Sequence, residues 1–277
     1  MRHRLAIGAV ALAALVAAVA VAATASAAPT AQITPPANIA KAGKVVFCMD
    51  ISFPPFGYFS ASNKPIGVEV DLVTAIDKLM GVKTTFRNTQ FDGLIPAMQS
   101  GQCDAIISGL YNKASRRKVV DFVNYAYVGN NIVVRHGNPH HVKGLAGLSG
   151  LKVGVESGTT LRLNLLAENK KLTAAGKKPM TVVDFPKDSD AFQQLIAGNV
   201  DAYFTSGSAA AYYAKKASGK VQIVGPTLAA LPFGIATRKN EKALHQAFAK
   251  GLSMLRKNGQ YLAIFKKWGA LNTVLKG

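Results

Sequence analysis

Short apolar segments alternate with longer amphipathic segments along most of the chain. Residues 44–49 and 181–185 are typical of buried strands, whereas Leu72, Ile76 and Leu79 recur at helical spacing. The pattern predicts strands over 44–49, 82–86, 103–108, 131–135, 151–155, 181–185, 221–224 and 232–237, and helices over 69–80, 92–100, 209–216, 241–257 and 261–268. Because strands and helices alternate, we expect an α/β fold with mainly parallel sheets covered by helices.

One helix–strand unit occurs twice. Residues 91–109 and 190–207 each contain a helix that ends in Gly, an Asp-Ala pair three residues later, and a strand that ends in small polar residues. The repeat indicates two lobes of similar build. Each lobe would present the carboxyl ends of its strands, where open α/β sheets bind ligands. The alternative is that these are two ordinary βαβ units whose Gly and Asp-Ala positions match by coincidence.

The first 27 residues are typical of a secretory signal. Arg2 and Arg4 precede a long Ala/Val/Leu run, and Ala-Ser-Ala at 25–27 fits a small-residue cleavage site. We expect residues 1–27 to be removed on export, although the run is also long enough for an uncleaved anchor. No Cys directly follows the run, so we expect no lipid anchor. Residues 28–40 are predicted to be a flexible leader.

The chain is strongly basic, with 33 Lys and Arg against 14 Asp and Glu and a formal charge of +19. Without the two signal arginines the charge is +17. The basic residues are scattered and form no stripe interleaved with aromatic residues, so we expect no nucleic-acid partner. We interpret the charge as solvated surface that favours contact with anionic membranes or partners.

Two groups of residues raise the question of a disulfide or a metal site. Cys48 and Cys103 fall in strands expected to be neighbours, so they are either disulfide-bonded in an exported protein or two buried thiols. His136, His140 and His141 share a polar loop, but no Cys, Asp or Glu stands nearby in sequence to complete a metal shell. We therefore expect a solvent-facing loop and no metal. We also expect no cofactor, because the glycines after this loop precede a strand instead of following one.

Seven short motifs occur in order along the mature chain. They are Asp50 through Pro55-Phe56, GVEVDL at 67–72, FDGLIP at 91–96, Gly101-x-x-Asp104, Arg116-x4-Asp121-Phe122, Gly158-Thr159-Thr160 and Gly198-x-x-Asp201-Ala202. Each motif is weak alone, but their order and spacing cover nearly all of the mature chain. In this respect the chain resembles the family 3 solute-binding proteins of bacterial ABC importers, the amino-acid-binding group.

The resemblance implies a two-lobed periplasmic-binding-protein fold of type II, in which two hinge strands join two α/β lobes. Lobe 1 would comprise residues 41–127 and 234–277, and lobe 2 residues 131–231. The hinges would fall near 127–130 and 231–233. A ligand that contacts both lobes would favour their closed arrangement.

The resemblance also implies a carboxylate site. Arg116 would bind the α-carboxylate of the ligand, because a guanidinium makes two parallel charge-assisted bonds to a carboxylate. Gly109 and Tyr111 would offer backbone groups. Thr159 and Thr160, at a helix N-terminus that itself favours anions, would complete the site from the other lobe. An ordinary surface arginine is the alternative for Arg116.

The rest of the implied site concerns the body and the cationic groups of the ligand. Phe53 and Phe91 would enclose the ligand, unless they are ordinary core aromatics, and Asp50 would face its side-chain end. Ser206 stands where the family usually has the acid that binds the ammonium. We hypothesise that Glu156 and Asp50 supply the negative charge instead, which suits a polar or cationic amino acid or a related amine.

The function implied by the resemblance is that of the periplasmic substrate-binding component of an ABC importer. The protein would be a monomer that binds a small ligand between its lobes, docks on a membrane permease and catalyses no reaction. A dehydratase of the cyclohexadienyl type on the same fold is the alternative, and would need a general acid such as Glu156 or Asp50 in the cleft. A receptor sensor domain is not expected, because no membrane or signalling segment follows Gly277.

Overall fold

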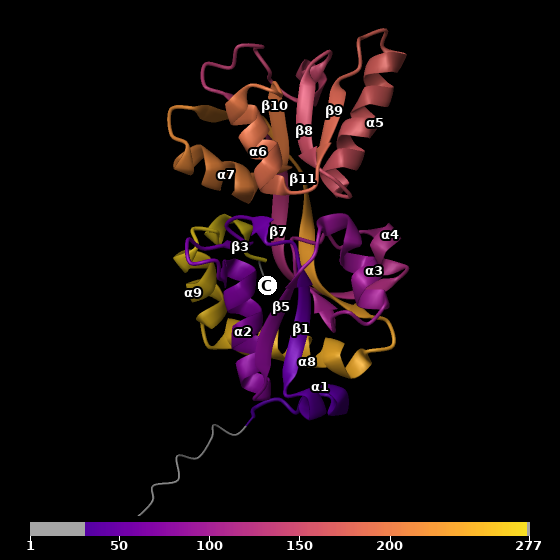
Figure 1. Cartoon of the computed structure of the whole chain (residues 1–277), viewed down its shortest axis with the longest axis vertical. Helices are drawn as coiled ribbons and strands as arrows, with labels where there is room; N and C mark the ends of the chain where they lie inside the picture. Colours follow the sequence, from indigo (N-terminus) through magenta and orange to yellow (C-terminus); the bar gives the residue numbers. More distant parts are fainter. Residues whose placement is uncertain (1–30, 276–277) are drawn as a thin grey trace, which may run out of the picture. The chain divides into compact units, whose positions relative to one another are not determined.

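The computed structural model describes residues 31–275 (Figure 1). The predicted secretory signal and residues 28–30 lie outside this range. Contrary to the prediction of a flexible leader, residues 31–42 pack on the body of the protein. Ile33 and Ile39, the latter in α1 (Ala37–Ala42), are buried, and the backbone N–H groups of Gln32 and Ile33 donate to the carbonyl of Leu79. No helix within the described range is both long and apolar enough to cross a membrane.

An eight-stranded sheet runs through the described chain in the order β5-β1-β6-β11-β7-β10-β8-β9 (Figure 1). Its strands are β1 (Lys44–Met49), β5 (Lys83–Asn88), β6 (Ala105–Ile106), β7 (Val120–Arg135), β8 (Lys152–Glu156), β9 (Thr181–Phe185), β10 (Ala202–Ser206) and β11 (Val221–Arg238). The pairs β1–β5, β1–β6, β8–β9 and β8–β10 are parallel. The expected mainly parallel α/β arrangement is therefore confirmed.

Helices cover both halves of this sheet. One half carries α2 (Val68–Met80), α3 (Leu94–Gln99), α4 (Ala114–Arg117), α8 (Lys242–Lys257) and α9 (Gln260–Lys267), and the other carries α5 (Thr160–Ala174), α6 (Asp188–Ala197) and α7 (Gly207–Lys216). Short elements complete the fold: the strands β2 (Ser52–Phe53), β3 (Gly57–Phe59) and β4 (Pro65–Ile66), and the 3₁₀ turns η1 (Phe91–Gly93), η2 (Leu145–Leu148) and η3 (Leu271–Thr273). The halves are the two lobes, and β7 and β11 connect them.

The two connecting strands differ from the prediction, which had separate strands over 131–135, 221–224 and 232–237. In the structure β7 and β11 are continuous and pair antiparallel over most of their length. The predicted strand over 221–224 stops where the pairing of β11 with β7 shifts register, between Val224 and Leu228. The predicted hinges near 127–130 and 231–233 fall inside these strands, and the lobe boundaries stay a prediction.

The sequence repeat has the same geometry in both lobes, which confirms it as structural. The backbone N–H of Val46 donates to Asp104 Oδ2, and that of Lys152 donates to Asp201 Oδ2, each at 2.8 Å. In return, the backbone N–H of Asp104 donates to the carbonyl of Val46, and that of Asp201 donates to the carbonyl of Lys152, again at 2.8 Å. Each Asp therefore fixes the start of its strand beside β1 or β8, which sets where the carboxyl ends of the strands lie.

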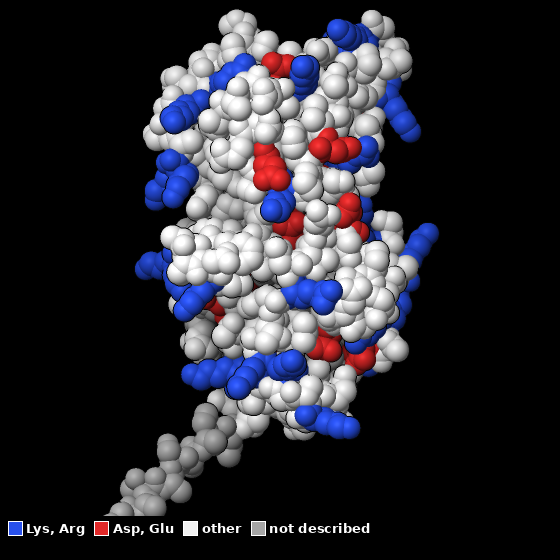
Figure 2. Space-filling model, in the orientation of Figure 1, with Lys and Arg blue, Asp and Glu red and all other residues white. Residues whose placement is uncertain are grey.

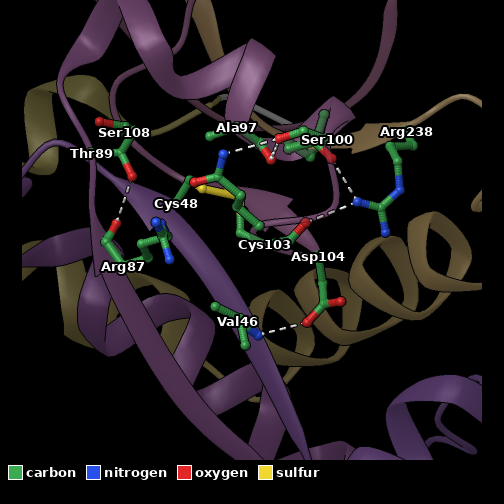
Figure 3. Close-up of a disulfide and its surroundings, with 12 residues drawn as sticks. Val46, Cys48, Arg87, Thr89, Ala97, Ser100, Cys103, Asp104, Ser108 and Arg238 are labelled. Atoms are coloured by element: carbon green, nitrogen blue, oxygen red, sulfur yellow. Dashed lines mark hydrogen bonds between the residues drawn. A yellow bond between two sulfur atoms is a disulfide. The ribbon is translucent and has the colours of Figure 1, made fainter.

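Cys48 and Cys103 form a disulfide with a Cα–Cα distance of 5.7 Å (Figure 3). Of the two possibilities left open by the sequence, a disulfide or two buried thiols, the structure has the disulfide. Cys48 lies in β1. Cys103 lies just before β6, which is the strand paired with β1. Beside the bridge, Arg238 Nη1 donates to the carbonyl oxygens of Met98 and Cys103, both at 2.8 Å. The disulfide, Asp104 and Arg238 together hold the chain between α3 and β6.

We expect the double substitution Cys48→Ser, Cys103→Ser to lower the free energy of unfolding by about 2–4 kcal/mol. The bridge spans a sequence separation of 55 residues, and its loss frees that loop in the unfolded chain. Urea unfolding of the wild type, with and without reductant, measures the effect. The reduced wild type should match the double variant, and an unchanged midpoint after reduction would contradict a stabilising bridge.

Candidate functional site

A cavity lies between the strand ends of the two lobes and contains most of the predicted site residues. It is lined by Phe53, Phe91, Ser108, Gly109, Tyr111 and Phe233 from lobe 1 or the connecting strands, and by Val155, Glu156, Thr159, Thr160, Leu161, Asp188, Phe204, Thr205 and Ser206 from lobe 2. Asp50 lines a second pocket, with Ser52, Lys187 and Ser189. Arg116 lies behind the lining, in contact with Phe91 and Tyr111.

The two lobes touch directly at the rim of this cavity. The backbone N–H of Asp188 donates to Ser52 Oγ at 3.2 Å. On the other side, a Cβ on Gly158 would lie 2.5 Å from Cβ of Asp92, so only glycine allows this approach. The loop that opens α5 therefore rests against η1, and the lobes enclose the cavity.

Arg116 is a buried cation without an acidic partner. Its Nη1 donates to the carbonyl of Tyr111 at 3.3 Å, and its Cζ lies 5.4 Å from the centroid of the Phe91 ring. None of the salt bridges within residues 31–275 involves it. Burial lowers the pKa of Arg116 to about 10, so the guanidinium stays charged at neutral pH. A buried charge of this kind is stabilised by an anionic group from a ligand.

The two predicted threonines differ in what they can offer. Thr159 is the N-cap of α5: its Oγ1 accepts from the backbone N–H of Arg162 and donates to the carbonyl of Glu156. Thr160 Oγ1 is buried and has no hydrogen-bond partner within the described chain. Of the two hydroxyl groups, Thr160 therefore has the one that is free for a ligand.

The backbone groups expected from Gly109 and Tyr111 are already engaged. The N–H of Gly109 donates to Glu69 Oε1 at 2.6 Å, and the carbonyl of Tyr111 accepts from Arg116. Gly109 has φ +56°, and a Cβ there would lie 2.9 Å from the ring of Phe53. The positive φ and the close approach of Phe53 therefore explain why position 109 is a glycine.

Ser206 is also used within the fold. Its Oγ accepts from the backbone N–H of Ala209 at 3.2 Å and lies 3.1 Å from Ser208 Oγ, which makes it the N-cap of α7. It lines the cavity, but its hydroxyl serves the helix.

Three buried acids lie at or near the cavity: Glu156 and Asp188 line it, and Asp50 lines the second pocket. Asp50 of lobe 1 and Glu156 of lobe 2 lie close enough to shift each other's pKa, and Asp188 is close enough to both to take part. Asp188 Oδ1 accepts from the hydroxyl groups of Tyr203 and Thr205. Glu156 Oε1 and Asp188 Oδ2 have no partner within the described chain.

Burial dominates the ionisation of these acids. It raises the pKa of Asp50 to about 6 and that of Asp188 to about 7. It raises the pKa of Glu156 well above its usual 4.5, and the charge of Asp50 adds to the effect. Carboxyl groups in such surroundings either hold a proton or need a cation beside them.

Asp188 is the functional candidate that the sequence reasoning missed. It is the first residue of α6, where an acid is commonly explained by the helix dipole. A second signal was available, because Asp188 follows the carboxyl end of β9, at the sheet edge where ligands bind.

Away from the cavity, the surface bears on the predicted histidine loop and on the scattered basic charge. His136, His140 and His141 are all exposed, which confirms a solvent-facing loop, and His140 Nε2 lies 3.3 Å from Asp201 Oδ1. Within residues 31–275 no group of three or more His, Cys, Asp or Glu could hold a metal ion. Figure 2 shows Lys and Arg side chains scattered over the visible face, with neutral surface between them.

Comparisons with known proteins place the chain among binding proteins. Residues 45–271 match the family model of the bacterial extracellular solute-binding proteins, family 3. The chain is 28% identical to the arginine-binding protein ArgT of Corynebacterium glutamicum over 84% of this chain and 77% of that one. It is 32% identical to the L-arginine-binding protein of Pseudomonas aeruginosa over 79% and 85% of the two chains.

A solved structure extends the likeness to three dimensions. An ancestral arginine-binding protein bound to arginine is 38% identical, covers 82% of this chain and 98% of its own, and aligns with a TM-score of 0.75. The fold is that of the type II periplasmic binding proteins, as the motifs predicted. The chain belongs to the bacterial extracellular solute-binding proteins of family 3.

Proposed function

We propose that the protein is the substrate-binding component of an ABC importer for a cationic amino acid, with L-arginine as the first candidate. The observation that carries this proposal is an excess of buried acid: Glu156 and Asp188 line the cavity and Asp50 lines the second pocket, whereas Arg116, behind the cavity lining, is the buried guanidinium. An amino acid with a cationic side chain brings one carboxylate and two cations, which complements that set. The relatives named for arginine support the same ligand class.

The proposed binding mode assigns one end of the ligand to each charged region. The carboxylate is held by Arg116 and the free hydroxyl of Thr160, at the N-terminus of α5. Phe53 and Phe91 cover the aliphatic body. The cationic end of the side chain lies at the Asp50–Glu156 pair, where it replaces the proton that the two carboxyl groups share.

In this proposal the ligand favours closure because it contacts both lobes. Asp50 belongs to lobe 1 and Glu156 to lobe 2, so a cation between them draws the lobes together. The closed, monomeric protein then docks on the permease. Removal of residues 1–27 releases it into the periplasm without a lipid anchor, in keeping with the sequence pattern.

Isothermal titration calorimetry of the refolded mature protein tests the ligand class. L-arginine and L-lysine should bind at least about tenfold more tightly than L-leucine and L-valine, a difference of about 1.4 kcal/mol. Equal affinities would contradict the cationic class. Failure to bind any amino acid would contradict the proposed function.

A dehydratase is the second candidate, and one observation favours it. Glu156 is a buried acid beside Asp50 whose raised pKa lets it hold a proton, as a general acid must. We propose binding without catalysis, because the arginine-binding relatives are named as binding proteins. Incubation with prephenate separates the two: conversion to product would favour the enzyme, and saturable amino-acid binding without turnover would favour the importer component.

Arg116→Ala should weaken L-arginine binding by about 2–5 kcal/mol, the range for removing one partner of a buried charged pair. Arg117→Ala is the matched control. Arg117 is the exposed neighbour, and its Nη1 donates to the carbonyl and to Oδ1 of Asn112, away from the cavity. Its substitution should change binding by less than about 0.5 kcal/mol. A loss of less than tenfold for Arg116→Ala in calorimetry would exclude it as the carboxylate ligand.

The ligand-free protein should become less stable as the pH rises from about 5 to about 8. The pKa values of Asp50, Glu69 and Asp188 are raised by burial to about 6, 7 and 7, so the folded protein binds more protons than the unfolded chain in this window. The stabilisation is complete below the unfolded pKa values and is lost as the pH passes the folded ones. Melting temperatures at pH 5 and pH 8 measure it, and a higher value at pH 8 would contradict the buried-acid account.

A further inference from the structure

Asp188 is a carboxyl group built into the wall of the cavity. It is 3% exposed, it lines the cavity directly, and no salt bridge within residues 31–275 involves it. Its Oδ2 is buried without a hydrogen-bond partner in the described chain. A buried carboxylate oxygen without a donor is costly, so its retention points to a donor that arrives with a ligand.

The side chain is fixed in place by the strand beside it. Oδ1 accepts from the hydroxyl of Tyr203 and, at 2.9 Å, from Oγ1 of Thr205, both in β10. The backbone N–H of Asp188 donates to Ser52 Oγ of the other lobe. One carboxylate oxygen is therefore committed to the fold while the other stays free, and the residue is oriented before any ligand binds.

The other polar groups at the cavity have different uses. Asp50 and Glu156 lie close together and influence each other's ionisation, and the hydroxyl of Ser206 caps α7. The Gly109 N–H is engaged by Glu69. Glu156 Oε1 and Asp188 Oδ2 are both buried without a partner in the described chain, but only Asp188 has its other carboxylate oxygen fixed by two hydroxyl groups.

We propose that Asp188 Oδ2 accepts the α-ammonium of the bound amino acid, which leaves the Asp50–Glu156 pair to the cationic side chain. This inference rests on the proposed function and names the group that recognises the amine. The site then has three separate charged positions: Arg116 for the carboxylate, Asp188 for the ammonium, and the acid pair for the side chain. It selects α-amino acids with a second cation and discriminates against the same molecules without the α-amino group.

Two ligands that differ only in that group test the assignment. L-arginine carries the α-ammonium, and 5-guanidinopentanoic acid has the same carboxylate and guanidinium without it. Calorimetry should show that Asp188→Asn weakens L-arginine binding about 30-fold or more, the lower end for losing a buried charged partner. Binding of 5-guanidinopentanoic acid should change less than about threefold, because that ligand makes no contact that the substitution removes.

The variant is chosen to keep the fold. Asn retains Oδ1 as the acceptor for Tyr203 and Thr205, so the ligand-free melting temperature at pH 8 should not fall below that of the wild type. Asp190→Asn, on the same helix and outside the cavity lining, is the matched control and should bind both ligands as the wild type does. Asp188→Glu keeps the charge and should retain a preference for L-arginine over the deaminated acid, even where Asp188→Asn folds poorly.

The outcomes separate this inference from the proposed function. If the wild type binds L-arginine and Asp188→Asn binds it equally well, the assignment of Asp188 is overturned while the function stands. Equal losses for both ligands overturn it too, since the effect would then not depend on the ammonium. If the wild type binds neither ligand, the proposed function fails and this inference fails with it.

Discussion

Buried carboxyl groups that lie close together without a buried basic partner in the described chain are the constraint on which the site depends. Asp50 and Glu156 come from different lobes and influence each other's ionisation, and the basic charge that lowers the pKa of Asp50 is that of the exposed Lys187. Two carboxylates in contact cannot both stay ionised, and a proton or a cation must lie between them. In the proposed function, the same contact opposes closure of an empty, ionised protein and favours closure around a cation. One pair of side chains would then couple the charge of the ligand to the movement of the lobes.

The fold brings these acids together through short-range backbone chemistry. Asp104 and Asp201 make the same pair of hydrogen bonds to the start of β1 and of β8. Each therefore sets the register of its lobe, and the strand that follows ends at the cavity. Asp50 follows β1 and Glu156 ends β8, so the strands that Asp104 and Asp201 bind carry the two acids. The disulfide at Cys48 reinforces only the lobe 1 copy.

The sequence predicted what depends on neighbours in the chain and missed what depends on distant partners. The Gly–Asp repeat was visible because a helix end and a strand start are local. The engagement of Gly109 was not, since its acceptor Glu69 lies 40 residues away. Asp188 resembled an ordinary first-turn acid, and only the approach of Ser52 and β10 places it in the cavity. The strand predicted over 221–224 ends at a point where β11 only shifts its register against β7.

Selectivity in such a site comes from the number of charges more than from the shape of the cavity. In the proposed binding mode, a neutral side chain would leave a proton on the Asp50–Glu156 pair and gain no ionic contact there. A cationic side chain would take the place of that proton and form a charge pair in a buried region, where Coulomb interactions are strongest. Because folding has already removed water from the acids, attraction to the cation would offset a desolvation cost that is present without the ligand. In that mode, the excess of buried acid over the single guanidinium of Arg116 distinguishes ligands of one cation from ligands of two.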